Sequence, residues 1–90
     1  MYRFVIEREI PTVGSFDRDQ LRDASQTSND ALAKLSPKVQ WEHSYVADNK
    51  TFCIYLADDE AAIHEHAKLS GFPANRITPI SSIIDPTTAN

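Results

Sequence analysis

Two alternating stretches in the middle of the chain constrain the fold more than any other feature. Residues 39–47 and 51–57 alternate bulky and polar side chains, the period of half-buried strands, and Asp48-Asn49-Lys50 separates them. A short turn at this break predicts a β-hairpin. The hairpin register then pairs three sets of residues: Ala47 with Lys50, Tyr45 with Phe52, and His43 with Ile54.

Helical periods flank the hairpin on both sides. Within residues 17–35, small or apolar residues recur three and four positions apart, which predicts one buried helix face. These residues are Leu21, Ala24, Ser28, Ala31, Leu32 and Leu35. Ser15 or Asp17 can cap this helix, and Pro37 ends it. A second helix is expected from the acidic residues at 58–60 to Ser70, with Gly71 as a left-handed stop.

Strand patterns open and close the chain. Tyr2 to Glu9 alternates, and residues 76–84 form a last strand whose Pro79 is tolerated mainly at a sheet edge. The order is β-α-β-β-α-β, the ferredoxin-like pattern of an α+β protein. Right-handed crossovers give a four-stranded antiparallel sheet of order 4-1-3-2 with both helices on one face. Residues 1–90 form a single domain, with 85–90 as a polar tail.

The hairpin presents two different faces. Because it is the more apolar, the first set is expected to face the helices: Trp41, His43, Tyr45, Phe52, Ile54 and Leu56. The opposite set contains Gln40, Glu42, Ser44, Val46, Thr51, Cys53, Tyr55 and Ala57, joined by Val5 and Glu7 of the first strand. This second set is too apolar for ordinary solvated surface, so we interpret it as a dimer face or a cavity wall.

A homodimer through the open sheet face, of the dimeric α+β barrel type, follows from this interpretation. Helices on one face of a 90-residue domain leave a patch of apolar side chains on the other insufficiently covered. The patch consists of Val5, Val46, Tyr55 and Ile80 or Ile84. A two-fold pair lets one patch serve both copies, and Tyr55 is expected near the centre of the interface.

Composition excludes several classes of partner. The net charge is −4 and the basic residues form no patch, which disfavours a nucleic acid or an anionic membrane as partner. No apolar run approaches the roughly 20 residues of a membrane span. Residues 1–10 lack the apolar core of a signal peptide, and the single Cys53 cannot form an intrachain disulfide. We expect a cytoplasmic protein.

Histidine, cysteine and carboxylate side chains offer a candidate metal site. Glu7, His43, Cys53 and His66 would suit nickel, zinc or copper if they came together. The strand pleat places His43 and Cys53 on opposite faces, so such a site would be shared across a dimer or use fewer ligands. His64 and His66 lie two apart on a helix and cannot share one ligand face; His66 is expected to be buried and His64 exposed.

Catalytic patterns are missing. The chain has no G-x-S-x-G elbow, Gly-rich phosphate loop or C-x-x-C, so a binding role is favoured over catalysis. The alternative to a metal protein is a cavity against the open sheet face that binds or transforms a small organic molecule. Glu7, Ser44, Cys53 and Tyr55 would line it, with Tyr45 as a further contact. A purely structural interaction module is the third hypothesis.

Several segments together resemble a known family. They are "RFVIEREIP" at the start, "WEHSYV" and "FCIY" in the hairpin, "IHEHAKLSGFPANRI" in and after the second helix, and "IIDPTTAN" at the end. With these motifs the chain is similar to small bacterial ferredoxin-like proteins of unknown function that are often described as nickel-binding. The likeness spans nearly the whole chain.

The resemblance implies a ferredoxin-like fold, homodimers and binding of a divalent transition metal such as nickel, with buffering or trafficking of that metal as the role. Several candidate residues fall within the matching motifs: Glu7, Tyr45, Cys53, Tyr55 and His66, with His43 at the W-x-H position. The predicted metal ligands are therefore Glu7, His43, Cys53 and His66. Ser44, Tyr45 and Tyr55 are the predicted contacts of a bound small molecule.

Overall fold

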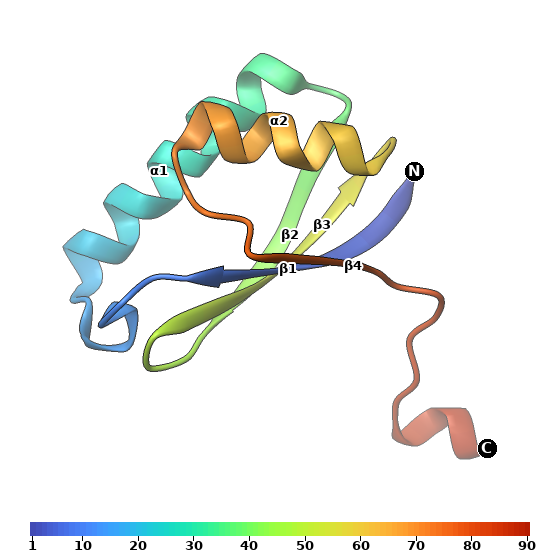
Figure 1. Ribbon diagram of the computed structural model, residues 1–90. Coiled ribbons are helices and arrows are strands. Elements are labelled where there is room, and N and C mark those ends of the chain that lie inside the picture. Colours follow the sequence, from blue (N-terminus) through green and yellow to red (C-terminus); the bar gives the residue numbers. More distant parts are fainter.

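A computed structural model describes residues 1–90 as two layers, a four-stranded sheet with two helices on one of its faces (Figure 1). The strands are β1 (Tyr2–Glu9), β2 (Val39–Val46), β3 (Lys50–Ala57) and β4 (Arg76–Pro79). The helices are α1 (Arg18–Leu35) and α2 (Glu60–Ser70), with short 3-10 turns η1 (Val13–Ser15) and η2 (Pro86–Ala89). Neither helix has the length and hydrophobicity that a membrane-spanning helix requires.

The predicted topology is confirmed. The sheet order is β2-β3-β1-β4, and all three neighbouring pairs are antiparallel. The central strands β1 and β3 pair along their whole length, from Tyr2 opposite Ala57 to Glu9 opposite Lys50. Pro79 lies on the edge strand β4, where its missing N–H interrupts no ladder.

The starts of both helices and the end of α2 follow from local chemistry. Asp17 caps α1 through a capping box, in which its carboxylate accepts from the Gln20 N–H and the Gln20 side chain accepts from the Asp17 N–H. Asp59 caps α2 by accepting from Ala62. Gly71 ends α2 in the left-handed region at φ 80°, where a side chain would be strained.

The hairpin register is confirmed, and the structure adds a bulge to it. Tyr45 lies opposite Phe52, His43 opposite Ile54, and the Ala47 N–H donates to Lys50 at 2.9 Å. Trp41 pairs with Tyr55, so Glu42 is the extra residue that the register shift between Trp41 and His43 accommodates. A bulge of this kind moves one side chain to the other face of the strand.

The predicted orientation of the hairpin is wrong for β3. Thr51, Cys53, Tyr55 and Ala57 are buried beneath the helices, whereas Phe52, Ile54 and Leu56 are half-buried on the open face. Both rows are apolar, so apolarity alone could not choose between them. The observed row also includes the small Cys53 and Ala57, beside which the helices can lie close to the sheet.

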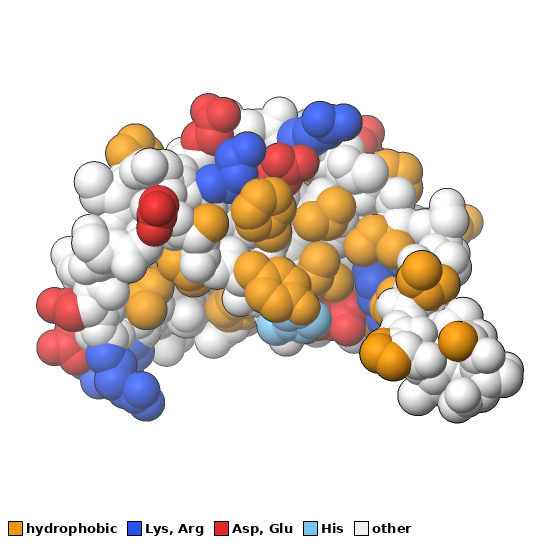
Figure 2. Space-filling model, turned by 90° about the horizontal axis from the view of Figure 1, so that it is seen from below, with side chains coloured by type: hydrophobic (Ala, Val, Ile, Leu, Met, Phe, Trp, Pro, Cys, Tyr) orange, Lys and Arg blue, Asp and Glu red, His pale blue; other side chains and the backbone are white.

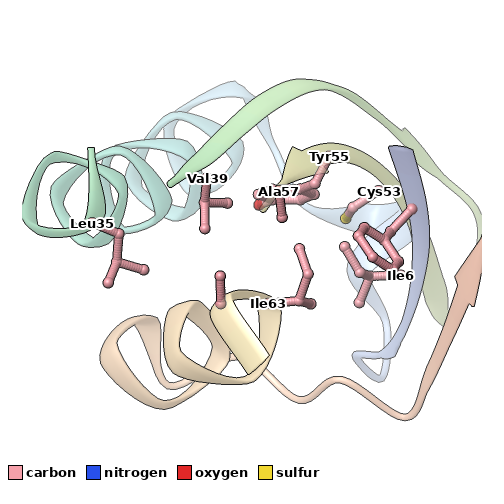
Figure 3. Packing of buried hydrophobic residues seen from close by; sticks show 9 residues of the cluster. Ile6, Leu35, Val39, Cys53, Tyr55, Ala57 and Ile63 are labelled. Atoms are coloured by element: carbon pink, nitrogen blue, oxygen red, sulfur yellow. The ribbon is translucent and has the colours of Figure 1, made fainter. Parts of the chain in front are cut away.

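The core lies between the helices and this row of the sheet. Figure 3 shows Ile6, Val39, Cys53, Tyr55 and Ala57 on the strand side with Leu35 and Ile63 on the helix side. Phe4 and Ala62 complete the buried cluster. Deleting a buried side chain of this kind costs about 2–5 kcal/mol in typical cores.

Tyr55 therefore cannot lie at the centre of an interface on the open sheet face. Its side chain is only 2% exposed and belongs to the core. The expectation failed because it depended on the same inverted assignment of the two β3 rows. Val5 and Glu7 do lie on the open face as predicted, opposite Ile54 and Phe52 respectively.

The last strand is shorter than the alternation suggested. β4 ends at Pro79 rather than at residue 84, since it pairs only with residues 4–7 of β1. One further bond, from the Ile80 N–H to Arg3 at 2.9 Å, continues the contact. Beyond it the chain leaves the sheet with Ile83 and Ile84 exposed, and the predicted polar tail forms η2 with Asp85 as its cap (Figure 1).

Gly14 generates a first testable prediction. A Cβ at this position would lie 2.7 Å from both the Ala47 carbonyl oxygen and the Asp48 Cα, so the backbone of η1 packs directly on the hairpin turn. Gly14→Ala should lower the free energy of unfolding by about 1–3 kcal/mol, the usual cost of overpacking. Urea unfolding measures it, with Glu65→Ala at an exposed position of α2 as the control. Equal stability of the two variants would contradict this contact.

Candidate functional site

A cavity of about 110 Å³ lies between the first half of α1 and the sheet. Leu21, Ala24 and Ser28 form its helix side, and the sheet contributes Arg8 and Tyr55 among others. Most of the lining is apolar. It is therefore a pocket for an apolar group with a small number of polar contacts, the usual character of a small-molecule site.

The bulge in β2 shapes one wall of this cavity. Residues three apart on a regular strand point to opposite faces, yet Trp41 and Ser44 both line the cavity, and the Trp41 Nε1–H donates to Ser44 Oγ at 2.9 Å. The Trp41 ring stacks on Tyr55 at a centroid distance of 6.3 Å. The extra residue Glu42 makes this arrangement possible.

Arg8 brings a buried positive charge to the same cavity. Its side chain follows Phe4 and Ile6 on the buried row of β1 and is 2% exposed. The guanidinium donates from Nη1 to the Pro73 carbonyl at 2.8 Å and lies 5.7 Å from the Tyr55 ring centroid and 6.0 Å from that of Phe72. Nη2 has no hydrogen-bond partner, and no carboxylate forms an ion pair with Arg8.

A polar chain links this charge to α2. Ser28 Oγ lies 3.1 Å from the Tyr55 hydroxyl and 3.3 Å from His66 Nε2. The same His66 nitrogen lies 3.4 Å from the Ser28 carbonyl oxygen. His66 is fully buried, and its Nδ1 has no partner. Buried polar groups are usually paired, so the free Arg8 and His66 nitrogens mark this side of the sheet as the polar centre of the core.

Burial shifts the pKa values of two members of this chain. Desolvation raises the pKa of Tyr55, against the opposing effects of the Ser28 hydrogen bond and the Arg8 charge. Desolvation and, second, the Arg8 charge lower the pKa of His66 below its usual value, against the Ser28 backbone hydrogen bond. Both side chains are therefore neutral at neutral pH, and Arg8 carries the only charge in the chain of contacts.

The open sheet face carries a second set of polar groups on an apolar background. Figure 2 shows this face with hydrophobic side chains gathered over its middle and a histidine beside them. His43 is exposed on β2, and its Nε2 lies 3.2 Å from the Tyr45 hydroxyl. With Glu42, both side chains line a shallow hollow beside Ile54 and Ile80.

Ion pairs hold the carboxylates of this face. Glu42 Oε1 accepts from Arg3 Nε at 2.6 Å. Glu7 lies 3.2 Å from Lys50 Nζ and 3.9 Å from Arg76 Nε. Partly exposed pairs of this kind are worth little and can be rearranged, so they do not prevent either carboxylate from binding a cation.

The structure divides the four predicted metal ligands between the two faces. Glu7 and His43 lie on the open face, and Cys53 and His66 lie beneath the helices. Within one chain no three His, Cys, Asp or Glu side chains come together to hold a metal ion. His64 is exposed on α2, as expected.

The predicted small-molecule contacts are divided as well. Ser44, Cys53 and Tyr55 line the cavity, but this cavity is on the helix-covered face and not on the open one. Tyr45 and Glu7 point to the open face and do not line it. Sequence reasoning also missed Arg8, although its position two residues after Ile6 puts it on the buried row of β1.

Comparison with known proteins agrees with the fold and gives the family. Residues 4–80 match the family described as "Nickel responsive protein SCO4226-like". The structure is similar to the crystal structure of SCO4226 from Streptomyces coelicolor A3(2), with a TM-score of 0.75 and 16% identity over 91% of this chain and 99% of that one. No curated protein matches the chain. The chain belongs to the SCO4226-like nickel responsive family.

The lowered pKa of His66 gives a pH prediction. The unfolded chain protonates this residue near pH 6.5, but the folded chain does so only at lower pH. The contribution of His66 to the free energy of unfolding is thus at its full value above about pH 6.5 and declines as the pH falls toward the folded-state pKa.

His66→Gln should reduce the loss of stability between about pH 7.5 and about pH 5.5, because the titrating group is gone. Urea unfolding of metal-free protein at both pH values measures this difference. His64→Gln, on the exposed side of the same helix, should leave the difference as in the wild type. A wild-type pH dependence in His66→Gln would show that other groups cause it.

Proposed function

We propose that this protein binds nickel or a similar divalent transition metal on its open sheet face, with His43 as the first ligand. The observation that carries the proposal is an exposed imidazole beside a carboxylate and a phenol hydroxyl in one hollow, in a chain of a nickel responsive family. Imidazole is a good ligand for nickel, and carboxylate oxygen can complete such a site. Buffering or trafficking of the metal is the corresponding role.

Electrostatics favour the open face of the sheet over the helix-covered face as the place for a divalent cation. Arg8 is close enough to lower the pKa of His66, and the same positive charge would oppose a divalent cation placed beside Cys53 and His66. The hollow on the open face is lined by Glu42 and its ion-pair partner Arg3, whose charges balance, whereas the Arg8 charge has no ion-pair partner. Of the four predicted ligands, His43 is therefore preferred, with Glu42 beside it in the hollow, whereas Glu7 lies on the same face outside the hollow.

A second copy of the chain would complete the donor set. One open face supplies His43 with Glu42 and Tyr45, which is fewer strong donors than a metal site usually has. Half-buried apolar residues surround them: Val5, Phe52, Ile54 and Leu56. An apolar face of this kind favours pairing, and two-fold pairing would bring a second His43 to the same interface.

Nickel titration of tag-free protein tests the metal proposal. His43→Ala should weaken nickel binding by more than the roughly 10–100-fold that loss of an outer-shell partner costs. His64→Ala removes another exposed imidazole, which lies outside the site, and should leave the affinity unchanged. His66→Gln should also bind as the wild type does. Retained affinity in His43→Ala together with loss in His66→Gln would move the site to the other face.

Light scattering at high micromolar concentration tests the dimer separately. Ile54 lies opposite both Val5 and His43, at the middle of the open face, so Ile54→Glu should give a monomer. Leu69→Glu places the same charge at an exposed apolar position on α2 and should leave the dimer intact. A monomeric wild type, or a dimeric Ile54→Glu, would contradict pairing through this face.

A further inference from the structure

We propose that the cavity beneath α1 binds a small organic monocarboxylate, whose carboxylate pairs with Arg8 and whose apolar body lies against Trp41 and α1. This site is on the opposite face of the sheet from the proposed metal site and does not depend on it. Its ligand is an anion, whereas the metal site takes a cation.

The Arg8 guanidinium is buried without a counter-charge. A charged side chain is almost never fully buried without a partner, because its desolvation is compensated only by a counter-charge or hydrogen bonds. Arg8 is 2% exposed, donates one hydrogen bond to the Pro73 carbonyl, leaves Nη2 without a partner, and is one of the residues that line the cavity. The missing counter-charge is therefore expected from a ligand, and the planar fork of arginine matches a carboxylate.

The lining and size of the cavity define the rest of the ligand. Two-thirds of the lining residues are hydrophobic, which requires an apolar body and disfavours a free inorganic anion. At about 110 Å³ the cavity is somewhat smaller than an engineered cavity of ~150 Å³ that holds benzene. A branched aliphatic acid of four or five carbons, whose alkyl part is smaller than benzene, fits the combination of one cation and a small apolar space.

Neighbouring hydroxyl groups can donate hydrogen bonds to the carboxylate end of the ligand. The Tyr55 ring lies under the Arg8 guanidinium, and its hydroxyl contacts Ser28 at 3.1 Å. The Tyr55 hydroxyl stays protonated because burial raises its pKa, so it can donate a hydrogen bond. Ser44 Oγ, placed in the cavity by the bulge, adds a second hydroxyl at the wall.

Tryptophan fluorescence gives a direct readout, because Trp41 is the only tryptophan and lines the cavity. Isovalerate is the probe, and isovaleramide is the uncharged control of nearly equal shape. Titrations contain a chelator, so that the result is independent of metal binding. Isovalerate should give a saturable fluorescence change and a higher melting temperature. The amide should bind about tenfold more weakly or worse, since hydrogen bonds to charged groups are the stronger ones.

Two variants locate the site. Arg8→Met removes the charge with little change in volume and should abolish the response to isovalerate. Ala24→Leu fills the cavity from α1 while the chain keeps Arg8, and it should also abolish the response, which keeps the test decisive if Arg8→Met does not fold. Ala33→Leu, exposed on the same helix, is the control and should bind as the wild type does.

Three results would overturn the proposal. The first is the absence of a saturable response to isovalerate up to about 10 mM, which would exclude a Kd of about 1 mM or tighter. The second is equal binding of the acid and the amide, and the third is retained binding in Ala24→Leu. None of these results bears on nickel binding at His43, which lies on the other face of the sheet.

Discussion

The antiparallel register of β1 against β3 decides which chemistry lies on which face of the sheet. It pairs Phe4 with Tyr55, Ile6 with Cys53 and Arg8 with Thr51 beneath the helices, and it leaves Val5, Glu7 and Ile54 on the open face. A slip of one residue would exchange every one of these positions. The buried cation and the exposed imidazole are therefore consequences of one set of ladder hydrogen bonds, and the two proposed sites are separated by the thickness of the sheet.

The architecture could be predicted from the sequence because its signals are local. Asp17, Asp59 and Gly71 mark helix boundaries by their own hydrogen bonding and conformation; Gly71 ends α2 as expected, and Asp17 and Asp59 are the caps among the candidates that the sequence offered. The order of the strands then follows from crossover handedness. No local signal determines which side of the sheet the helices cover. The row with Cys53 and Tyr55 and the row with Phe52 and Ile54 are both apolar, so only packing against α1 and α2 decides which of them is buried.

The candidate sites could be predicted only in part for the same reason. His43, Ser44, Cys53 and Tyr55 are chemically conspicuous, and each of them lines a hollow or cavity in the structure. Their grouping depends on the bulge at Glu42, which places Trp41 and Ser44 on one face and has no sequence signal of its own. Arg8 did have a signal, since a charged residue continues the buried row of Phe4 and Ile6.

The central claim is that a divalent metal binds the open face and not the polar core. Paramagnetic nickel(II) added to isotope-labelled, tag-free protein broadens the amide signals of nearby residues, so NMR spectra locate it without any mutation. The account predicts early broadening around His43 and its cross-strand neighbours Ile54 and Val5, with the signals of Ser28 and Ile63 preserved. Early broadening at Ser28 and Ile63, with sharp signals around His43, would contradict it.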